Sequence, residues 1–462
     1  MTSETGPRFD DRRRPAPVSF PVSLTIAGSD SGGGAGIQAD LRAMAAHETF
    51  PTSVVTSVTA QHTRGVERST ALAPDDVRAQ YEAVADDFAV GAAKTGMLGT
   101  ADVVRTVRAC VAEATFPLVV DPVMVATSGD RLLDPAGERA CEELVGEATL
   151  VTPNRDEAAV LVGSDSTEPT PREAGERLLE MGAEAALVTG GHGDGDTVRD
   201  VLVTDAGVRA FAHPRIDTAA THGSGCSLSA AITANLARGE DLETAVAEAV
   251  SFASRAVRYP LDVGGGPGVV HPLVEVRNDA EAQSTVATVR GLVDQFVAMD
   301  VGPLVAEVGM NVVGATPYAE AIDETAAVEG RITRTLDGVE PNRGVRFGAS
   351  SHLARFLLAA REHDPGLRFA TNCRLTASTR RGLERLDAPV AWFDRTAEPD
   401  EASTMDWAAD RVFDRADEPP RAVADEGAVG KEPMIRVVGG TPAEVESLVE
   451  HLLDEAAAGG EP

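Results

Sequence analysis

The sequence predicts an α/β protein in which helices flank a mainly parallel β-sheet, followed by a second, smaller α/β unit. Two observations lead to this prediction. Short apolar runs rich in β-branched residues alternate with helical stretches as far as residue 272, and a new series of strand and helix patterns begins near residue 286. Because this alternation favours parallel strands joined by crossover helices, we expect functional side chains at the carboxyl ends of the strands.

The expected elements of the first unit follow one another in a regular order. An apolar run at 22–27 is expected to form a buried strand, and it leads into a glycine-rich loop at 28–36 and a helical pattern at 37–47. Further strands are expected at 53–60, 89–97, 117–120, 150–152 and 185–189, and helices at 73–87, 100–114, 135–146 and 171–181. A strand, a glycine loop and a helix are a usual setting for a phosphate contact, although neither G-x-G-x-x-G nor G-x-x-x-x-G-K-[ST] fits this loop.

Composition restricts the classes of function. The 462 residues are enough for two or three domains with cores of their own. A formal net charge of −32 argues against nucleic-acid binding, because such a surface repels a phosphate backbone. Abundant Asp and Glu, with arginine in place of nearly every lysine, resemble the cytoplasmic proteins of extreme halophiles. No apolar run is long enough to span a bilayer, so we expect a cytoplasmic protein with no membrane partner.

Two rare residue types add information. The only lysines are Lys94 and Lys431, and each either marks a place where a compact ammonium cannot be exchanged for a guanidinium group or is a chance survival. The cysteines have no C-x-x-C spacing, which argues against a zinc site and against a disulfide framework. They are Cys110, Cys141, Cys226 and Cys373.

The most informative stretch is a turn of small residues ahead of a helical run. Gly223, Ser224 and Gly225 can direct their N–H groups to one place, where the helix dipole adds positive charge and an anion can bind. Cys226 would lie in the first turn of that helix, where the pKa of a thiol is lowered and a thiolate can accept a proton. The turn could therefore bind a transferring phosphoryl group and deprotonate the attacking alcohol. The alternative is an ordinary helix N-terminus with an inert, buried cysteine.

Carboxyl and amide side chains follow two of the expected strands. Asp121 comes directly after the strand at 117–120, and Asn154 and Glu157 follow the strand at 150–152. Such groups hold Mg²⁺ against nucleotide phosphates, directly or through water. A helix N-cap is the alternative for Asp121 or Asn154 taken alone. Their convergence at one edge of the sheet favours the magnesium site.

Six blocks of the first unit together resemble a known family. They are LTIAGSD at 24–30, GAGIQAD at 34–40, AQHTRGV at 60–66, KTGML at 94–98, TPN at 152–154 and THGSGC at 221–226. In this order they resemble the hydroxymethylpyrimidine/phosphomethylpyrimidine kinases of thiamine biosynthesis, which belong to the ribokinase superfamily. The resemblance covers about residues 22–272. It implies a ribokinase-like fold, ATP and Mg²⁺ as cofactors, and phosphorylation first of 4-amino-5-hydroxymethyl-2-methylpyrimidine and then of its monophosphate.

The resemblance also implies roles for individual residues. It makes the turn 223–226 an anion hole, with Cys226 as the base, and it places Asp121 and Glu157 near the metal. The positions implied for substrate binding are Gly28, Asp40 and Gln61, and those implied for nucleotide binding are Asn154, Thr189 and Gly191. Thr189 departs from the family pattern, because relatives commonly have a lysine there. A contact to the nucleotide is therefore either missing or supplied by an arginine.

The second unit resembles an archaeal-type thiamine-phosphate synthase domain. The resemblance covers about residues 290–455 and depends on the blocks VRFGASSH at 345–352 and GAVGKEP at 427–433. It implies that a pyrimidine diphosphate is joined to thiazole phosphate with release of pyrophosphate, and that Arg331 and His352 occupy positions associated with catalysis. Lys431 is a further candidate for a phosphate ligand because lysine is so scarce. The alternatives are a solvated face for Arg331 and a helix cap for His352.

These observations divide the chain into a flexible tail at 1–20, a kinase domain at 21–275, a linker at 276–288 and a synthase-like domain at 289–462. The leading hypothesis is a two-function enzyme that acts on small molecules and forms a homo-oligomer. One alternative makes the second unit a non-catalytic sensor of thiamine phosphate, or an assembly module, behind an active kinase. Another is a kinase for pyridoxal or a different small alcohol, against which Cys226 and Gln61 weigh.

Overall fold

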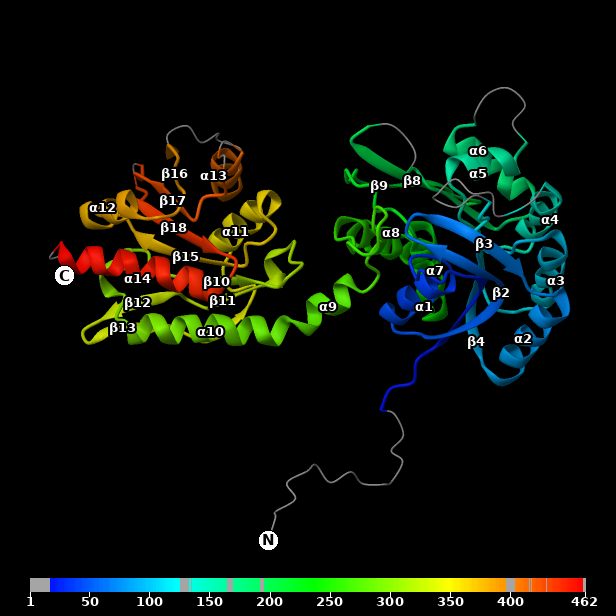
Figure 1. The fold of residues 1–462 in the computed structure, drawn as a ribbon, viewed down its shortest axis with the longest axis horizontal. Coiled ribbons are helices and arrows are strands. Elements are labelled where there is room, and N and C mark those ends of the chain that lie inside the picture. The colour runs from blue at the N-terminus through cyan, green and yellow to red at the C-terminus, as the bar shows by residue number, and fades with distance from the viewer. Residues whose placement is uncertain are drawn as a thin grey trace, which may run out of the picture. The chain divides into compact units, whose positions relative to one another are not determined.

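The chain forms two compact units, Met1–Val274 and Glu275–Pro462, each with a β-sheet of its own (Figure 1). The computed structural model describes residues 17–124, 133, 135–163, 169–191, 195–395, 404–414, 416, 418–428 and 430–459. The predicted α/β class is confirmed for both units. Of the tail expected at 1–20, only 17–20 lie within the described residues.

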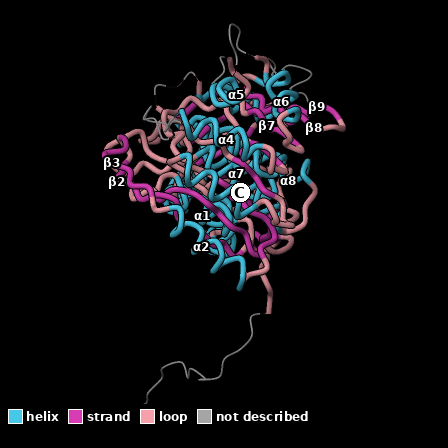
Figure 2. The backbone as a smooth tube through the Cα atoms, turned by 90° about the vertical axis from the view of Figure 1, so that its right-hand side faces the viewer, coloured by secondary structure: helices cyan, strands magenta, loops and turns pink. Residues whose placement is uncertain are grey.

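A nine-stranded sheet forms the centre of the first unit, with the strand order β3-β2-β1-β4-β5-β6-β7-β8-β9. Its strands are β1 (Val22–Ser29), β2 (Phe50–His62), β3 (Gly65–Ala71), β4 (Val90–Thr95), β5 (Leu118–Val120), β6 (Leu150–Val151), β7 (Ala185–Val188), β8 (Thr197–Thr204) and β9 (Gly207–Pro214). The six strands in the middle of this order, β2-β1-β4-β5-β6-β7, pair in parallel with one another. The outer strands β3, β8 and β9 are joined to the sheet by antiparallel pairs. The hairpins β2–β3 and β8–β9 therefore lie at opposite ends of the sheet (Figure 2).

Helices cover both faces of this sheet because the strands alternate their apolar side chains. One core packs Leu24 and Ile26 of β1 against one group of helices, and the other packs Val119 and Leu187 against a second group. The first group is α2 (Pro74–Asp87), α3 (Ala101–Val111), α4 (Pro135–Val145), α5 (Arg155–Leu161) and α6 (Pro171–Glu180). The second group is α1 (Gly36–Ala46), α7 (Ser224–Ala237) and α8 (Leu242–Arg258). The face that carries α1 and α7 is the one that builds the candidate site.

The second unit has a seven-stranded sheet with the order β14-β11-β10-β15-β18-β17-β16. Every pair in it is antiparallel except β16–β17. Its strands are β10 (Val312–Ala315), β11 (Thr325–Val328), β14 (Val345–Phe347), β15 (Phe369–Arg374), β16 (Val390–Trp392), β17 (Ala422–Asp425) and β18 (Met434–Gly439), and β12 (Ile332–Thr335) and β13 (Gly338–Pro341) form a separate hairpin. Helices α10 (Ala282–Ala298), α12 (Ala377–Arg385) and α14 (Pro442–Ala458) pack on one face, and α11 (His352–His363) and α13 (Thr404–Phe413) on the other.

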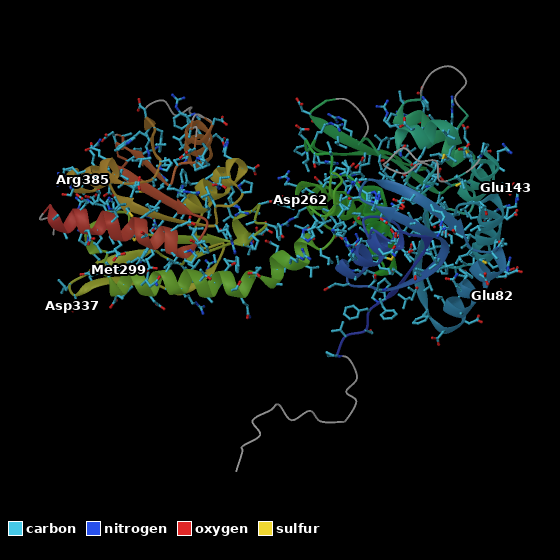
Figure 3. The ribbon with its side chains drawn as sticks, in the orientation of Figure 1. Glu82, Glu143, Asp262, Met299, Asp337 and Arg385 are labelled. Carbon is cyan, nitrogen blue, oxygen red and sulfur yellow. The ribbon has the colours of Figure 1, made fainter. Side chains whose placement is uncertain are left out.

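The segment expected as a linker is helical. Residues 276–280 belong to α9 (Val274–Ala280) and residues 282–288 to the start of α10, with Glu281 between the two helices. The surface of both units carries acidic side chains, among them Glu82 and Glu143 on the first unit and Asp337 on the second (Figure 3). Within the described ranges, no helix combines the length and apolar character needed to cross a membrane.

Candidate active site

Asp30 fixes the shape of the glycine loop that follows β1. Its carboxylate accepts hydrogen bonds from the backbone N–H groups of Gly32 at 2.8 Å, Gly34 at 2.9 Å and Ala35 at 2.8 Å, and His222 Nε2 lies 3.3 Å away. Burial raises the pKa of Asp30, but the hydrogen bonds from His222 and the loop amides outweigh burial, so the pKa is lowered. Asp30 was not among the predicted site residues, although it ends the LTIAGSD block.

The glycine loop and the turn at the start of α7 are in direct contact. Gly223 has a φ of 88°, and a β-carbon there would fall on the carbonyl oxygen of Gly34. A β-carbon on Gly34 would in turn fall on the ring of His222. Glycine is required at position 223, because its backbone is left-handed and faces the backbone of Gly34, and a side chain at position 34 would displace the ring of His222.

The turn presents free backbone donors at the N-terminus of α7. The N–H of Ser224 bonds to Thr221 O at 3.1 Å, and that of Ser227 bonds to Gly223 O at 2.9 Å. Within the described part of the chain, no backbone hydrogen bond is recorded for the N–H groups of Gly225 and Cys226. Two open donors at the positive end of a helix dipole suit a phosphoryl group, as the sequence predicts.

The predicted lowering of the Cys226 pKa is wrong. Burial raises the pKa of this thiol to about 12, although Lys94 and a hydrogen bond from the backbone N–H of Gly36 pull it down, and the negative charges of Asp40 and Asp121 add to the rise. The residue as a whole keeps partial exposure. The helix N-terminus is therefore too weak to ionise a thiol that is enclosed beside two carboxylates. In this state Cys226 is a thiol, not a thiolate.

A buried ammonium joins two of the predicted site carboxylates. Lys94 on β4 has no exposed surface, and its Nζ lies 3.0 Å from Asp40 Oδ1 on α1 and 3.8 Å from Asp121 Oδ2 beyond β5. Burial lowers the pKa of Lys94, but the charges of Asp40, Cys226 and Asp121 outweigh burial and raise it. Burial raises the pKa of Asp40, against the opposing effects of Lys94 and Thr25. Lys94 was not predicted as a site residue, although the scarcity of lysine pointed to it.

Asp121 and Glu157 form the acidic side of the site. Asp121 accepts a hydrogen bond from Ser229 Oγ on α7 at 3.0 Å. Glu157 caps α5 in a reciprocal arrangement in which its Oε2 accepts from Asn154 N at 3.0 Å and Asn154 Oδ1 accepts from Glu157 N at 2.9 Å. Burial and the charge of Asp121 raise the pKa of Glu157 to about 8. The N-cap interpretation of Asn154 is thus present in the structure, and this cap holds Glu157 in place.

The donor set of these two acids fits Mg²⁺. No group of three or more His, Cys, Asp or Glu side chains in the described ranges is arranged to enclose a metal ion. Mg²⁺ needs no such cage, because it keeps several waters and binds through one or two carboxylates together with substrate phosphates. The pKa values of Asp121 and Glu157 are both raised by burial, so a nearby cation would stabilise their ionised forms.

The remaining predicted residues of the first unit lie around this centre. Gln61 Nε2 is 3.5 Å from His222 Nε2, beside the turn. Gly28 packs against the side chains of Met97 and Ser57, so its missing β-carbon serves close packing. Thr189 pairs with Asn154 as a parallel bridge at the ends of β6 and β7.

An arginine contacts the segment in which the family pattern has its lysine. Arg215 Nη1 donates to the carbonyl oxygen of Gly191 at 2.9 Å, two residues beyond Thr189. A positive charge thus lies near this predicted nucleotide-binding segment, although a threonine replaces the lysine. His192, which follows Gly191, lies outside the described residues.

The three candidates of the second unit come from separate elements. Arg331 lies between β11 and β12 with a left-handed φ of 75°, and its guanidinium donates to Val308 O. His352 is the first residue of α11, and Lys431 is exposed in the turn before β18. A non-glycine residue in the left-handed region is a common feature of functional sites.

Comparison with known proteins agrees with this geometry. Residues 30–271 match the phosphomethylpyrimidine kinase family, and residues 288–451 match the family described as thiamine-phosphate synthase ThiN. The chain is 45% identical over 256 residues to the hydroxymethylpyrimidine/phosphomethylpyrimidine kinase of Streptomyces coelicolor, which covers 55% of this chain and 95% of that protein. It is 42% identical over 265 residues to the thiamine biosynthesis bifunctional protein ThiED of Geobacter sulfurreducens, covering 56% of this chain and 54% of that one.

Solved structures give the same assignment of the fold. The pyridoxal kinase of Bacillus subtilis, solved as an ADP complex, is 32% identical with a TM-score of 0.52 and covers 56% of this chain and 99% of its own. The pyridoxal kinase of Staphylococcus aureus with AMP-PCP and pyridoxal is 29% identical with a TM-score of 0.52, and covers 56% and 96%. The chain therefore belongs to the phosphomethylpyrimidine kinase family and carries a ThiN domain C-terminal to its kinase domain in the sequence.

Proposed function

We propose that the first unit phosphorylates 4-amino-5-hydroxymethyl-2-methylpyrimidine and then its monophosphate with ATP, and that the second unit joins the resulting diphosphate to thiazole phosphate. The observation that supports this most strongly is the turn at Gly223, whose open amides lie beside the buried group of Lys94, Asp40 and Asp121. In this proposal the phosphoryl site and the site of the small alcohol meet at Cys226, whose thiol is influenced by Lys94, Asp40 and Asp121.

In the first reaction the hydroxymethyl oxygen attacks the γ-phosphorus of ATP, and the bond to the β–γ bridging oxygen breaks to release ADP. The backbone N–H groups of Gly225 and Cys226 stabilise the negative charge on the transferred group. Gln61 supplies an amide that can bond to the aminopyrimidine. The carboxylate of Asp40 has no exposed surface in this structure, and it would accept from the ligand through a lone pair that Thr25 and Lys94 leave open. Asp121 and Glu157 would hold Mg²⁺, which neutralises phosphate charge when it is bound.

The proton of the alcohol must leave during this step. Cys226 is the residue that the turn places next to the phosphoryl site, but its thiol is protonated at neutral pH because its pKa is raised to about 12. Only a small fraction of thiolate is available, although that fraction is strongly basic. In the second phosphorylation the attacking oxygen already belongs to a phosphate, so no proton acceptor is needed.

For the second unit we propose synthesis of thiamine phosphate with release of pyrophosphate. Arg331 would stabilise the departing pyrophosphate, while His352 orients a phosphate, and Lys431 offers a further ammonium. The competing hypothesis is a sensor that binds thiamine phosphate without turnover. Arg331→Ala and His352→Ala separate the two, because loss of product in a folded protein supports catalysis, whereas a wild-type protein without turnover supports sensing.

The experiment that tests the whole proposal uses the purified chain in high salt with the hydroxymethylpyrimidine, Mg·ATP and thiazole phosphate. Mass spectrometry should detect the pyrimidine monophosphate, the diphosphate and thiamine phosphate in succession. Pyridoxal belongs in the same assay, because two solved pyridoxal kinases share this fold. A faster reaction with pyridoxal than with the hydroxymethylpyrimidine would contradict the proposed substrate.

A further inference from the structure

The position of Lys94 in the sheet explains how it reaches two sites at once. Lys94 on β4 and Thr25 on β1 are register partners in the parallel pair, so their side chains leave the same face of the sheet. Helix α1 covers that face and brings Asp40 over both, where Thr25 Oγ1 donates to Asp40 Oδ2 at 2.6 Å and Lys94 Nζ donates to Asp40 Oδ1 at 3.0 Å. Each oxygen of Asp40 therefore has its own fixed donor.

Lys94 also faces the phosphate side of the site. Its Nζ is 3.8 Å from Asp121 Oδ2, the same oxygen that accepts from Ser229 Oγ on α7. Asp40 and Lys94 have no exposed surface, and Asp121 is 6% exposed, so water screens these charges little. A single buried ammonium thus interacts with two buried carboxylates. Asp40 is on the proposed pyrimidine side, and Asp121 is on the proposed metal and phosphate side.

The surroundings of Nζ leave little space for a larger cation. Nζ is fully enclosed between Asp40 Oδ1 at 3.0 Å and Asp121 Oδ2 at 3.8 Å, and even a β-carbon on Gly96 would lie only 3.3 Å from it. An ammonium fits this space, whereas the wider guanidinium group would displace its neighbours. This accounts for a lysine at position 94 in a chain that otherwise uses arginine almost throughout.

We infer that Lys94 is a positioning residue that couples the pyrimidine pocket to the nucleotide site, so that binding at one strengthens binding at the other. The inference depends on the proposed kinase function of the first unit. While the nucleotide site is empty, Asp40 and Asp121 share one positive charge. A cation that arrives with the nucleotide compensates Asp121, and Lys94 is then left to hold Asp40 in the geometry that the aminopyrimidine requires.

Calorimetric titration of the full chain tests this coupling without turnover. The hydroxymethylpyrimidine is titrated into wild-type protein and into Lys94→Met, each with and without a saturating magnesium complex of a non-hydrolysable ATP analogue. In the wild type we expect the analogue to tighten pyrimidine binding about fivefold or more. In Lys94→Met the factor should fall to about one, while both ligands still bind. Arg105→Met, which removes an exposed ion pair with Asp102 on α3, is the matched control and should keep the wild-type factor.

If Lys94→Met does not fold, Lys94→Gln gives the same test, because it removes the positive charge between Asp40 and Asp121 and leaves a polar group in its place. The inference would be overturned if either folded variant kept the wild-type ratio of pyrimidine affinities with and without the analogue. It would also be overturned if the wild type bound the pyrimidine with the same affinity in both conditions. Failure of the wild type to bind the pyrimidine at all would overturn the proposed function, and the inference with it.

Discussion

The carbonyl oxygen of Gly34 occupies the place where a side chain on Gly223 would begin. The glycine loop after β1 and the turn before α7 are 189 positions apart in the sequence but meet backbone to backbone. The geometry of the phosphoryl site is therefore set by two loops at once, and the carboxylate of Asp30 holds one of them in shape.

We expect Gly223→Ala to abolish kinase activity. Gly239, at the other end of α7, provides a matched control because its φ of 89° equals the 88° of Gly223 within a degree, yet nothing lies within 4 Å of an added β-carbon. Gly239→Ala should cost about 1 kcal/mol of stability from its left-handed backbone and keep its activity. Single-turnover assays with both variants measure the difference. Equal activity of the two would show that the contact with Gly34 is unimportant.

The raised pKa of Glu157 makes stability depend on pH. This carboxyl has a pKa of about 8 in the folded protein against an ordinary value of 4.5. Between these values the folded state binds a proton that the unfolded state does not, so the free energy of unfolding falls as pH rises from about 4.5 to about 8. In Glu157→Gln we expect this fall to be smaller, by an amount on the order of a few kcal/mol, in urea unfolding at a series of pH values.

Glu173 gives the control for this experiment, because it forms the same reciprocal cap with Thr170 on α6 but is exposed, with a lowered pKa. A carboxyl with a lowered pKa stabilises the folded state at pH values above its ordinary pKa of 4.5. Its contribution to the free energy of unfolding therefore does not decrease between pH 5 and 8. Glu173→Gln should therefore leave the slope in that window unchanged. A wild-type slope in Glu157→Gln would show that Glu157 is not the group responsible.

The two phosphorylations should respond differently to pH and to Cys226. With a thiol pKa of about 12, the thiolate fraction rises tenfold for each pH unit, so the single-turnover rate of the first phosphorylation should increase steadily between pH 7 and 9. The second should be nearly flat there, because a phosphate monoester has its second pKa near 6. Cys226→Ala should remove the pH dependence of the first step and slow it much more than the second. Equal losses in both steps would exclude the base role.

Arg331→Gly distinguishes the role of the guanidinium group in the reaction from the effect of the left-handed backbone on stability. Because φ is 75°, glycine is favoured over any other residue at this position, and we expect the variant to gain about 1 kcal/mol from the backbone. Formation of thiamine phosphate should nevertheless be lost, while the pyrimidine diphosphate accumulates from the intact kinase unit. Product analysis by mass gives both results from one sample. Continued synthesis of thiamine phosphate would remove Arg331 from the proposed mechanism.

A buried ion group stabilises the second unit. Asp425 is fully buried and lies 2.9 Å from Arg436 Nη1 and 3.0 Å from Arg395 Nε. Asp425→Asn leaves two enclosed guanidinium groups without a full counter-charge and should cost about 3–5 kcal/mol. Both tryptophans, Trp392 and Trp407, lie in this unit, so their fluorescence follows its unfolding directly.

The matched control for Asp425→Asn is the removal of an exposed ion pair in the same unit. Arg385→Met breaks the pair with Glu455, in which the arginine side chain is 65% exposed, and it should change stability by less than about 1 kcal/mol. A comparable cost for the two variants would mean that the buried position of Asp425 gives it no special weight.

The sequence was informative where a local pattern determines the structure. The apolar runs and the small-residue turn predicted β1, α7 and the place of Cys226 in the first turn of α7. The expected strand ends also placed Asp121 after β5 and Glu157 after β6, while their role at a metal stays a prediction. The pKa of Cys226 could not be predicted, because it depends on burial among Asp40, Lys94 and Asp121, which come from different elements.

Long-range pairing explains the other differences. The antiparallel hairpin β8–β9 and the mostly antiparallel sheet of the second unit depend on partners that a linear pattern does not specify. Lys94 was visible as a rare lysine, but only the folded sheet shows that its ammonium lies between two carboxylates.

The different environments of the two lysines also make the chain suited to selective labelling. Lys94 has no accessible surface, whereas Lys431 is exposed in the second unit. An amine-reactive dye applied to the folded protein therefore has a single lysine to acylate, and it would attach one probe to Lys431, the candidate phosphate ligand of the ThiN domain. Unfolding the chain before the reaction would double the number of labelled lysines, so dye uptake counts the molecules in which the kinase core has opened.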